Sequence, residues 1–297
     1  MNDPLSYASL APTARVGVRG LPHLVDSMVG GGVYVLIAET PTARFPILTE
    51  SLHSAIHDGL VCTVVVPSEP VQFIQRIESY GDLNVHELLA ANRLHFFVMQ
   101  DEFSKKIFRF GAEGFVDELE HFEIPENSYL LFDQADDLLS LHDLSLALDQ
   151  LDVLRKWAAQ KRVTTLLVFS RATGTQAGTL NALMDSLTGI ARLGADKDGL
   201  ELVFDYWQSP EGAVAARNFR LTTLDSGLYE ASTKLVTFEQ ASEGEPDAHV
   251  EEVEEADAHF FYMDPDLGSL AKQMPGTWHQ VDTLVGLMHA TRNTRSA

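Results

Sequence analysis

Short apolar runs that alternate with helical patterns constrain the fold of this chain more than any other feature. Runs of this length and composition are typical of strands that are buried on both faces of a parallel sheet. They cover Val33–Ala38, Val61–Val66, Leu94–Met99, Tyr129–Phe132 and Val163–Phe169. Helical patterns lie between several of them, at Ile47–Ile56, Val71–Tyr80 and Leu141–Gln160. The alternation predicts an α/β domain with a mostly parallel sheet and helices on both faces.

The pattern changes after a further predicted helix, Leu180–Leu187. Turn residues now separate short strand-like runs: Ile190–Leu193, Leu200–Trp207, Asn218–Thr223 and Leu228–Ala231. These runs predict a small antiparallel meander at the end of the domain. A parallel core with late antiparallel strands favours a RecA-like fold of the P-loop NTPase type. Flavodoxin-like and Rossmann topologies are the alternatives, and neither readily accounts for the late strands.

An acidic segment divides the chain. Glu239–Asp257 holds nine acidic residues and no Lys or Arg, and such a run buries too little apolar surface to offset its ordering entropy. We therefore expect a RecA-like domain at 1–238, an acidic linker at 239–258 and a short appendage at 259–297. About forty residues are too few for an independent core, so the appendage is expected either to pack back on the domain or to be the lead-in to a further domain.

Charge and cysteine content exclude several classes of function. The chain of 297 residues has 43 acidic and 21 basic residues, a formal charge of −22. Such a surface repels phosphate backbones and anionic membranes, so nucleic acid is not an expected partner. The single cysteine, Cys62, lies in an apolar run, which predicts a buried and inert thiol. The first ten residues lack the features of a signal peptide, and no apolar run is long enough to span a bilayer. A cytoplasmic location is expected.

The loop after the first strand lacks the residues of a phosphate site. A P-loop needs glycines, a Lys for the β- and γ-phosphates and a Ser or Thr for magnesium. Here Glu39–Pro46 contains no glycine and no lysine, and its two prolines remove backbone donors. Glu39 is expected to add a negative charge where phosphates would sit, and Arg44 is a weak substitute for the Lys. The loop is therefore interpreted as degenerate.

A second NTPase element is better preserved. The strand Tyr129–Phe132 is followed by Asp133, the pattern that holds magnesium in active enzymes, although a capping aspartate fits equally well. The candidate site is thus a vestigial nucleotide site made of Thr40, Thr42, Arg44 and Asp133. We expect no catalytic residue, no bound metal and no cofactor. His53 and His57 have metal-ligand spacing but no third ligand, so they are interpreted as solvent-facing.

Several runs resemble a known family. They are Gly31–Ile37, Thr63–Val66, the segment Leu200–Tyr229 and the tail residues Thr277–Gln280 and Thr291–Ala297. Together they are similar to the N-terminal domain of BcsE, a regulator of bacterial cellulose biosynthesis and secretion, with the tail resembling the lead-in to that family's receiver-like domain. The resemblance implies a degenerate NTPase-like module that forms a homodimer. It also implies assembly on the inner-membrane cellulose synthase complex with the BcsR–BcsQ complex and the membrane protein BcsF.

Cyclic di-GMP signalling in that family uses an Arg-x-x-Asp motif in a C-terminal domain. No arginine in this chain has an aspartate three positions later; Arg192 is followed by Asp196, four positions away. Binding of cyclic di-GMP by this chain is therefore not expected.

Three hypotheses of function follow. The first is a non-catalytic scaffold of a cellulose secretion complex that reaches the inner membrane through partners. The second is a nucleotide-sensing RecA/KaiC-like ATPase with an unusual loop, in which residual ATP binding persists. The third is a related sensory domain for a small ligand.

Overall fold

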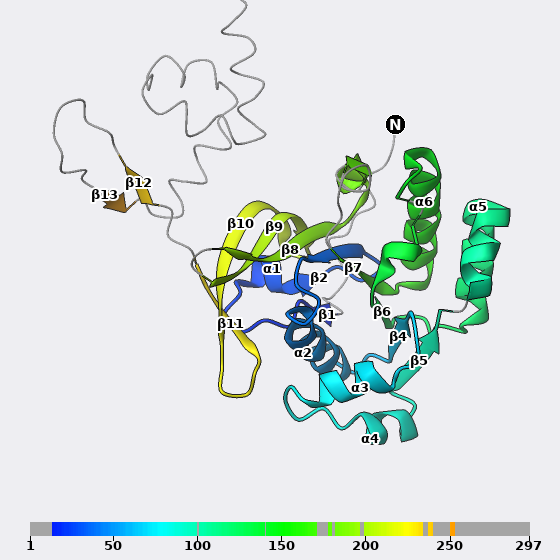
Figure 1. The fold of residues 1–297 in the computed structure, drawn as a ribbon, viewed down its shortest axis with the longest axis horizontal. Coiled ribbons are helices and arrows are strands. Elements are labelled where there is room, and N and C mark those ends of the chain that lie inside the picture. Colours follow the sequence, from blue (N-terminus) through cyan, green and yellow to red (C-terminus); the bar gives the residue numbers. More distant parts are fainter. Residues whose placement is uncertain are drawn as a thin grey trace, which may run out of the picture. The chain divides into compact units, whose positions relative to one another are not determined.

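A computed structural model gives the fold of the chain (Figure 1). The structure describes residues 14–99, 101–139, 141–170, 178–179, 182–196, 199–233, 237–239 and 250–252. It divides into two units, Met1–Thr233 and Lys234–Ala297. The predicted appendage at 259–297 lies outside the described residues.

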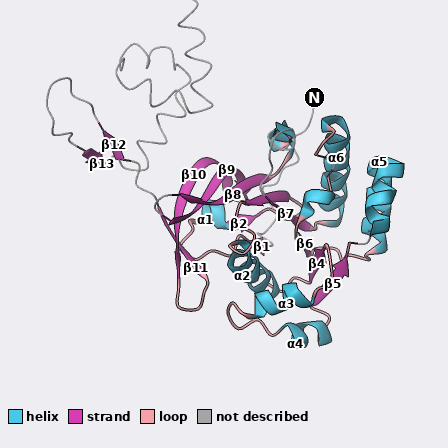
Figure 2. Ribbon diagram, viewed as in Figure 1, coloured by secondary structure: helices cyan, strands magenta, loops and turns pink. Residues whose placement is uncertain are grey.

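The first unit consists of helices and strands that alternate along most of its length (Figure 2). Its α-helices are α1 (His23–Asp26), α2 (Arg44–His57), α3 (Val71–Glu78), α4 (Val85–Ala90), α5 (Asp101–His121) and α6 (Leu144–Lys161), with 3-10 turns η2 (Ala135–Asp137) and η3 (Met184–Ser186). Its strands are β1 (Ala14–Arg15), β2 (Ser27–Met28), β3 (Val33–Ala38), β4 (Cys62–Val66), β5 (Leu94–Val98), β6 (Tyr129–Phe132), β7 (Thr164–Ser170), β8 (Gly189–Asp196), β9 (Gly199–Ser209), β10 (Gly212–Thr223) and β11 (Tyr229–Thr233).

One nine-stranded sheet organises the unit, in the order β11-β10-β9-β8-β3-β7-β6-β4-β5. Strands β8, β3, β7, β6, β4 and β5 are parallel, whereas β9, β10 and β11 continue the sheet in antiparallel fashion. The expected α/β fold, a mostly parallel sheet with late antiparallel strands, is confirmed. One detail differs: the run at Ile190–Leu193 is a parallel neighbour of β3, because Tyr34–Ala38 pair with Gly189–Leu193. It is therefore a strand of the parallel core that also begins the predicted antiparallel meander, because β9 pairs with it in antiparallel orientation.

Two apolar cores cover the two faces of the sheet. One contains side chains of α1, α2, α3 and α4, together with the large rings Trp207, Phe204 and Phe219 of β9 and β10. The other contains side chains of α5 and α6, including Leu151 and Leu154. Every residue of β3, β4 and β6 is buried, as the unbroken apolar runs predict for strands covered on both sides.

The 21-residue helix α5 was not predicted from the sequence. Its apolar pattern is interrupted by Gly111, whose backbone angles (φ 61°, ψ −139°) lie outside the helical region and divide α5 into two helical pieces. A salt bridge between Lys106 and Glu118 joins the two pieces. Of the predicted helix at 180–187, Ala182 is helical and the 3-10 turn η3 follows before β8, whereas Leu180 and Asn181 lie outside the described residues.

The N-terminal segment at 16–19 contacts both α2 and β11, at the antiparallel end of the sheet. Gly17 has φ +79°, and a Cβ there would lie 2.2 Å from the backbone nitrogen of Ser51 in α2. The Ser51 hydroxyl donates to the Val16 carbonyl at 2.5 Å. Arg19 then pairs with Glu230 of β11, with backbone hydrogen bonds from Arg19 to Tyr229 and from Ala231 to Arg19. Only glycine allows the segment to approach the helix this closely.

In the second unit the structure describes one antiparallel strand pair, β12 (Thr237–Glu239) with β13 (Val250–Glu252). Both strands lie at or within the acidic segment that was interpreted as a linker. The remainder of that segment is outside the described residues.

Candidate functional site

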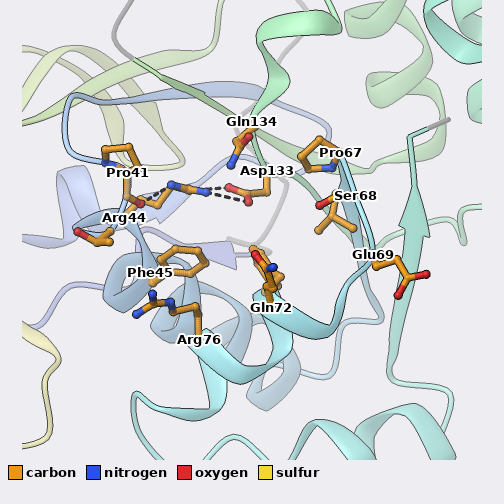
Figure 3. A pocket seen from close by; sticks show the side chains of 13 residues that line it. Pro41, Arg44, Phe45, Pro67, Ser68, Glu69, Gln72, Arg76, Asp133 and Gln134 are labelled. Atoms are coloured by element: carbon orange, nitrogen blue, oxygen red, sulfur yellow. Dashed lines mark hydrogen bonds and ion pairs between the residues drawn. The ribbon is translucent and has the colours of Figure 1, made fainter. Parts of the chain in front are cut away.

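The carboxyl ends of β3, β4 and β6 meet at one edge of the sheet, because these strands run in the same direction. Ligands of open α/β sheets bind at this edge. A pocket of about 230 Å³ lies here, between the starts of α2 and α3. It is lined by Pro41, Thr42, Arg44, Phe45, Val66, Pro67, Ser68, Glu69, Gln72, Phe73, Arg76, Asp133 and Gln134. Figure 3 shows this pocket from close by.

A buried ion pair closes one side of the pocket (Figure 3). The Arg44 guanidinium donates to the Asp133 carboxylate twice, from Nε to Oδ1 at 2.6 Å and from Nη2 to Oδ2 at 3.0 Å. Each side chain is only 5% exposed. The two hydrogen bonds are parallel and engage both carboxylate oxygens, which is the strongest geometry available to this pair of residue types.

Local structure fixes Arg44 in this position. The degenerate loop ends at Ala43, and α2 begins at Arg44. The third nitrogen of the guanidinium, Nη1, donates to the Pro41 carbonyl, and the guanidinium carbon lies 4.5 Å from the centroid of the Phe45 ring. The charge of Arg44 is thus satisfied within the loop and by Asp133. It is not directed at an open phosphate position.

Local structure also fixes the position of Asp133. Asp133 follows β6 directly, and its backbone nitrogen donates to the Val65 carbonyl at 2.9 Å. The next residue, Gln134, adopts the left-handed conformation (φ 57°, ψ 60°), which costs a non-glycine residue about 1 kcal/mol or more. This turn leads into η2, where the Asp136 carboxylate accepts from the backbone and hydroxyl of Ser170 at the end of β7. Asp136 therefore has a structural partner.

The predicted site residues come together in part. Thr42, Arg44 and Asp133 line the pocket, whereas Thr40 does not. Glu39 was expected to place its charge at the phosphate position. Instead its carboxylate lies beside β8, where a Cβ at Gly194 would be 3.2 Å from Glu39 Oε2. That expectation was wrong because the end of β3 is hydrogen-bonded to Leu193 of β8, which orients Glu39 toward that strand.

The sequence reasoning also missed several pocket residues. Pro67, Ser68, Glu69 and Gln72 follow β4, and Arg76 lies further along α3. A cluster of polar residues directly after a buried strand was the available signal. It was not assigned to the site because the neighbour of β4 in the sheet, β6, is far away in the sequence.

The donor set does not fit magnesium. Both oxygens of Asp133 accept hydrogen bonds from Arg44, and a guanidinium at this distance would repel a divalent cation. Among the described residues, no group of three or more His, Cys, Asp or Glu side chains is placed to hold a metal. His53 is exposed and His57 is 81% exposed. Cys62 is fully buried, and burial raises the pKa of its thiol to about 12.

A protein-family model decides the family. The model of the cellulose biosynthesis protein BcsE, N-terminal domain, matches residues 10–229. This chain belongs to that family. The match confirms the resemblance seen in the sequence and links the chain to cellulose biosynthesis. None of the curated proteins compared with the chain has a significantly similar sequence.

Solved structures confirm the type of fold. The chain is similar to a KaiC-like protein from the hyperthermophilic archaeon Pyrococcus horikoshii OT3, with a TM-score of 0.52 and 14% sequence identity. The similarity covers 75% of this chain and 99% of the archaeal chain. The expected RecA-like fold is thereby confirmed. Among the described residues, no helix combines the length and the apolar character that crossing a membrane requires.

Proposed function

We propose that this chain is a non-catalytic scaffold and regulatory domain of a bacterial cellulose synthesis and secretion complex. It acts by forming a homodimer and by binding partner proteins, and it does not turn over nucleotide. The membership in the BcsE N-terminal family supports the biological setting. The single observation that carries the proposal is the buried, bidentate Arg44–Asp133 ion pair.

The ion pair opposes nucleotide binding in three ways. Arg44 engages both oxygens of Asp133, the carboxylate that would otherwise hold magnesium. Without the metal, the charge that develops on the phosphates is not neutralised. The ion pair also holds the only arginine of the loop away from a phosphate. Finally, breaking it to admit a ligand leaves two charges in a buried environment, and such a rupture costs about 3–5 kcal/mol. A ligand would have to supply this energy before any net binding appeared.

The size of the pocket supports the same conclusion. Its volume of about 230 Å³ is below the range of about 300–1,000 Å³ that is common for small-molecule sites. The loop also offers few backbone donors. Pro41 and Pro46 have no backbone N–H, and Arg44, the first residue of α2, is paired with Asp133. A triphosphate would therefore lack both the space and the donors that an active P-loop provides.

The family membership suggests the partners. We propose that the chain is cytoplasmic and is recruited to the inner membrane by binding the membrane protein BcsF, and that it also binds the BcsR–BcsQ complex. Co-expression of the chain with each partner, followed by affinity purification and size-exclusion chromatography, tests this part. Failure of every partner to co-elute with a folded chain contradicts it.

Calorimetry tests the loss of nucleotide function. Titration of the purified chain with ATP, GTP and cyclic di-GMP in the presence of magnesium is expected to give no binding heat. Phosphate release from ATP and GTP is expected to equal that of a blank. Magnesium-dependent hydrolysis that is lost in Asp133→Asn would overturn the proposal, since that variant removes the charge of the carboxylate that pairs with Arg44 in the pocket.

A nucleotide-sensing role is the second candidate, and one observation favours it. The pocket remains open beside the ion pair, with Thr42 and Gln134 on its wall, so a ligand could displace Arg44 from Asp133. ATP or GTP binding without hydrolysis, weakened by Thr42→Ala, would support this candidate. A small-ligand sensory role would instead show as binding of a compound other than a nucleotide at the same pocket.

A further inference from the structure

Strand β5 leaves one edge of the sheet open. It is the last strand in the sheet order and pairs only with β4. Arg93 accepts a hydrogen bond from Cys62, and Met99 donates one to Val66, so both residues direct their backbone groups toward β4. Because backbone groups alternate in direction along a strand, those of Leu94, Phe96 and Val98 point away from the sheet. No hydrogen bond to these outward groups is found within the described part of the chain.

The opposite edge of the same sheet is protected. The segment around Arg19 pairs with Glu230 and exchanges backbone hydrogen bonds with β11. Among the described residues, the fold therefore covers the β11 edge and leaves the β5 edge without a backbone partner. An uncovered edge strand is a template for pairing with another chain, and monomeric proteins protect such edges with lysine, proline, bulges or very short strands.

None of these protective features is present in β5. Its sequence, Leu94-His95-Phe96-Phe97-Val98, contains no lysine, proline or glycine, and its pairing with β4 is regular. Phe96 packs on Phe73 at the face of α3, with ring centroids 6.0 Å apart. Phe97 packs on Phe122 at the opposite face, at 4.8 Å. These two rings are only partly buried, and Val98 is 37% exposed.

We infer that the free edge of β5 pairs with β5 of a second copy of this chain, in antiparallel orientation. The sequence of β5 is complementary to itself in an antiparallel pair. With the two-fold axis at Phe96, Phe96 faces its counterpart and Leu94 faces Val98, so apolar residues meet apolar residues along the whole contact. These are also the residues whose backbone groups point outward. The three facing pairs would form about six hydrogen bonds in the antiparallel pattern.

Charge favours a second copy at this edge. The chain has a net charge of −22, so most of its surface repels another copy. The strand itself has no acidic or basic side chain other than His95. Its apolar character also lets Phe96 and Val98 become buried, which is the main source of favourable free energy in association.

The inference rests on the proposed function, which includes a homodimer, and specifies the surface that forms it. The test is analytical ultracentrifugation of the full chain and two edge variants. Val98→Pro removes one outward N–H without touching the bonds to β4, and Val98→Lys adds a protective charge. Either variant is expected to weaken dimerisation at least about tenfold. Leu148→Lys is the matched control, because Leu148 on α6 is 36% exposed, and it should leave the dimer unchanged.

The outcomes distinguish the inferred pairing through β5 from the proposed homodimer itself. A dimeric wild-type chain that becomes monomeric in both folded edge variants supports pairing through β5. A dimer that persists with unchanged affinity in Val98→Pro and Val98→Lys overturns this inference and leaves the proposed dimeric scaffold standing. A wild-type chain that is monomeric at about 100 μM, far above the micromolar range of ordinary specific interfaces, overturns both. Circular dichroism confirms that each variant is folded.

Discussion

Arg44 and Asp133 lie 89 positions apart in the sequence, yet they form a bidentate ion pair in which each side chain is 5% exposed. The pair joins the start of α2 to the end of β6 at the edge where RecA-like proteins carry their nucleotide site. We expect the pair to contribute to stability, and we propose that it also opposes nucleotide binding.

The structural consequence concerns stability. Arg44→Met or Asp133→Leu leaves one buried charge without its partner, so each single variant is expected to lower the free energy of unfolding by about 3–5 kcal/mol. The double variant Arg44→Met, Asp133→Leu removes both charges and is expected to be near neutral or more stable than either single variant. Urea unfolding of all four proteins forms a double-mutant cycle. Additive single effects would mean that the two charges do not interact.

Gly17 should be far less tolerant of substitution than Gly59. Both have positive φ, +79° and +89°, so replacement by alanine costs each of them about 1 kcal/mol in backbone strain. A Cβ at Gly17 would also lie 2.2 Å from Ser51 N, whereas nothing lies within 4 Å of a Cβ at Gly59. Gly17→Ala is therefore expected to cost at least about 2 kcal/mol more than Gly59→Ala, as measured by urea unfolding. Equal losses would contradict the close contact with α2.

Glu120 is expected to make stability depend on pH. It accepts hydrogen bonds from Lys161 Nζ at 2.6 Å and from Trp157 Nε1 at 2.8 Å, and the bond from Lys161 lowers the pKa of the carboxyl below its ordinary value of 4.5. A depressed carboxyl pKa contributes stability above the unfolded pKa, and this contribution is lost as the pH falls through the folded pKa.

Glu120→Gln should therefore lower stability at pH 7 and make no difference near pH 2. The effect should be small and should weaken with salt, since Glu120 is 48% exposed. Thermal unfolding of the two proteins at both pH values measures it. A loss that is the same at both pH values would mean that the side chain acts by packing and not by charge.

Cys62 should be unreactive in the folded protein. It is fully buried, and burial raises the pKa of the thiol to about 12, so almost no thiolate exists at pH 8. Labelling with a chromogenic thiol reagent is expected to be at least about a hundredfold slower in buffer than in 6 M guanidinium chloride. Rapid labelling in buffer would show that β4 opens readily, which its position between β5 and β6 opposes.

The sequence by itself determined the elements and the general fold. Unbroken apolar runs such as those of β3, β4 and β6 are buried on both faces, and a strand of this kind has few alternatives to a parallel sheet with helices on both sides. The absence of glycine and lysine after β3 likewise established that the loop is degenerate. The helix α5 was missed because Gly111 interrupts its pattern. These conclusions depend on local composition and spacing, which a single sequence displays.

Only the tertiary structure decided how the residues of the candidate site are arranged. Nothing local indicates that Arg44 turns to Asp133, that Glu39 turns to β8, or that β8 is parallel to β3. Each depends on the strand order, which places β3 between β7 and β8 and β4 beside β6. The free edge of β5 and the covered edge of β11 have the same origin. Contacts between residues that are distant in the sequence follow from how the sheet is assembled, and the free energy of packing the whole domain selects that arrangement.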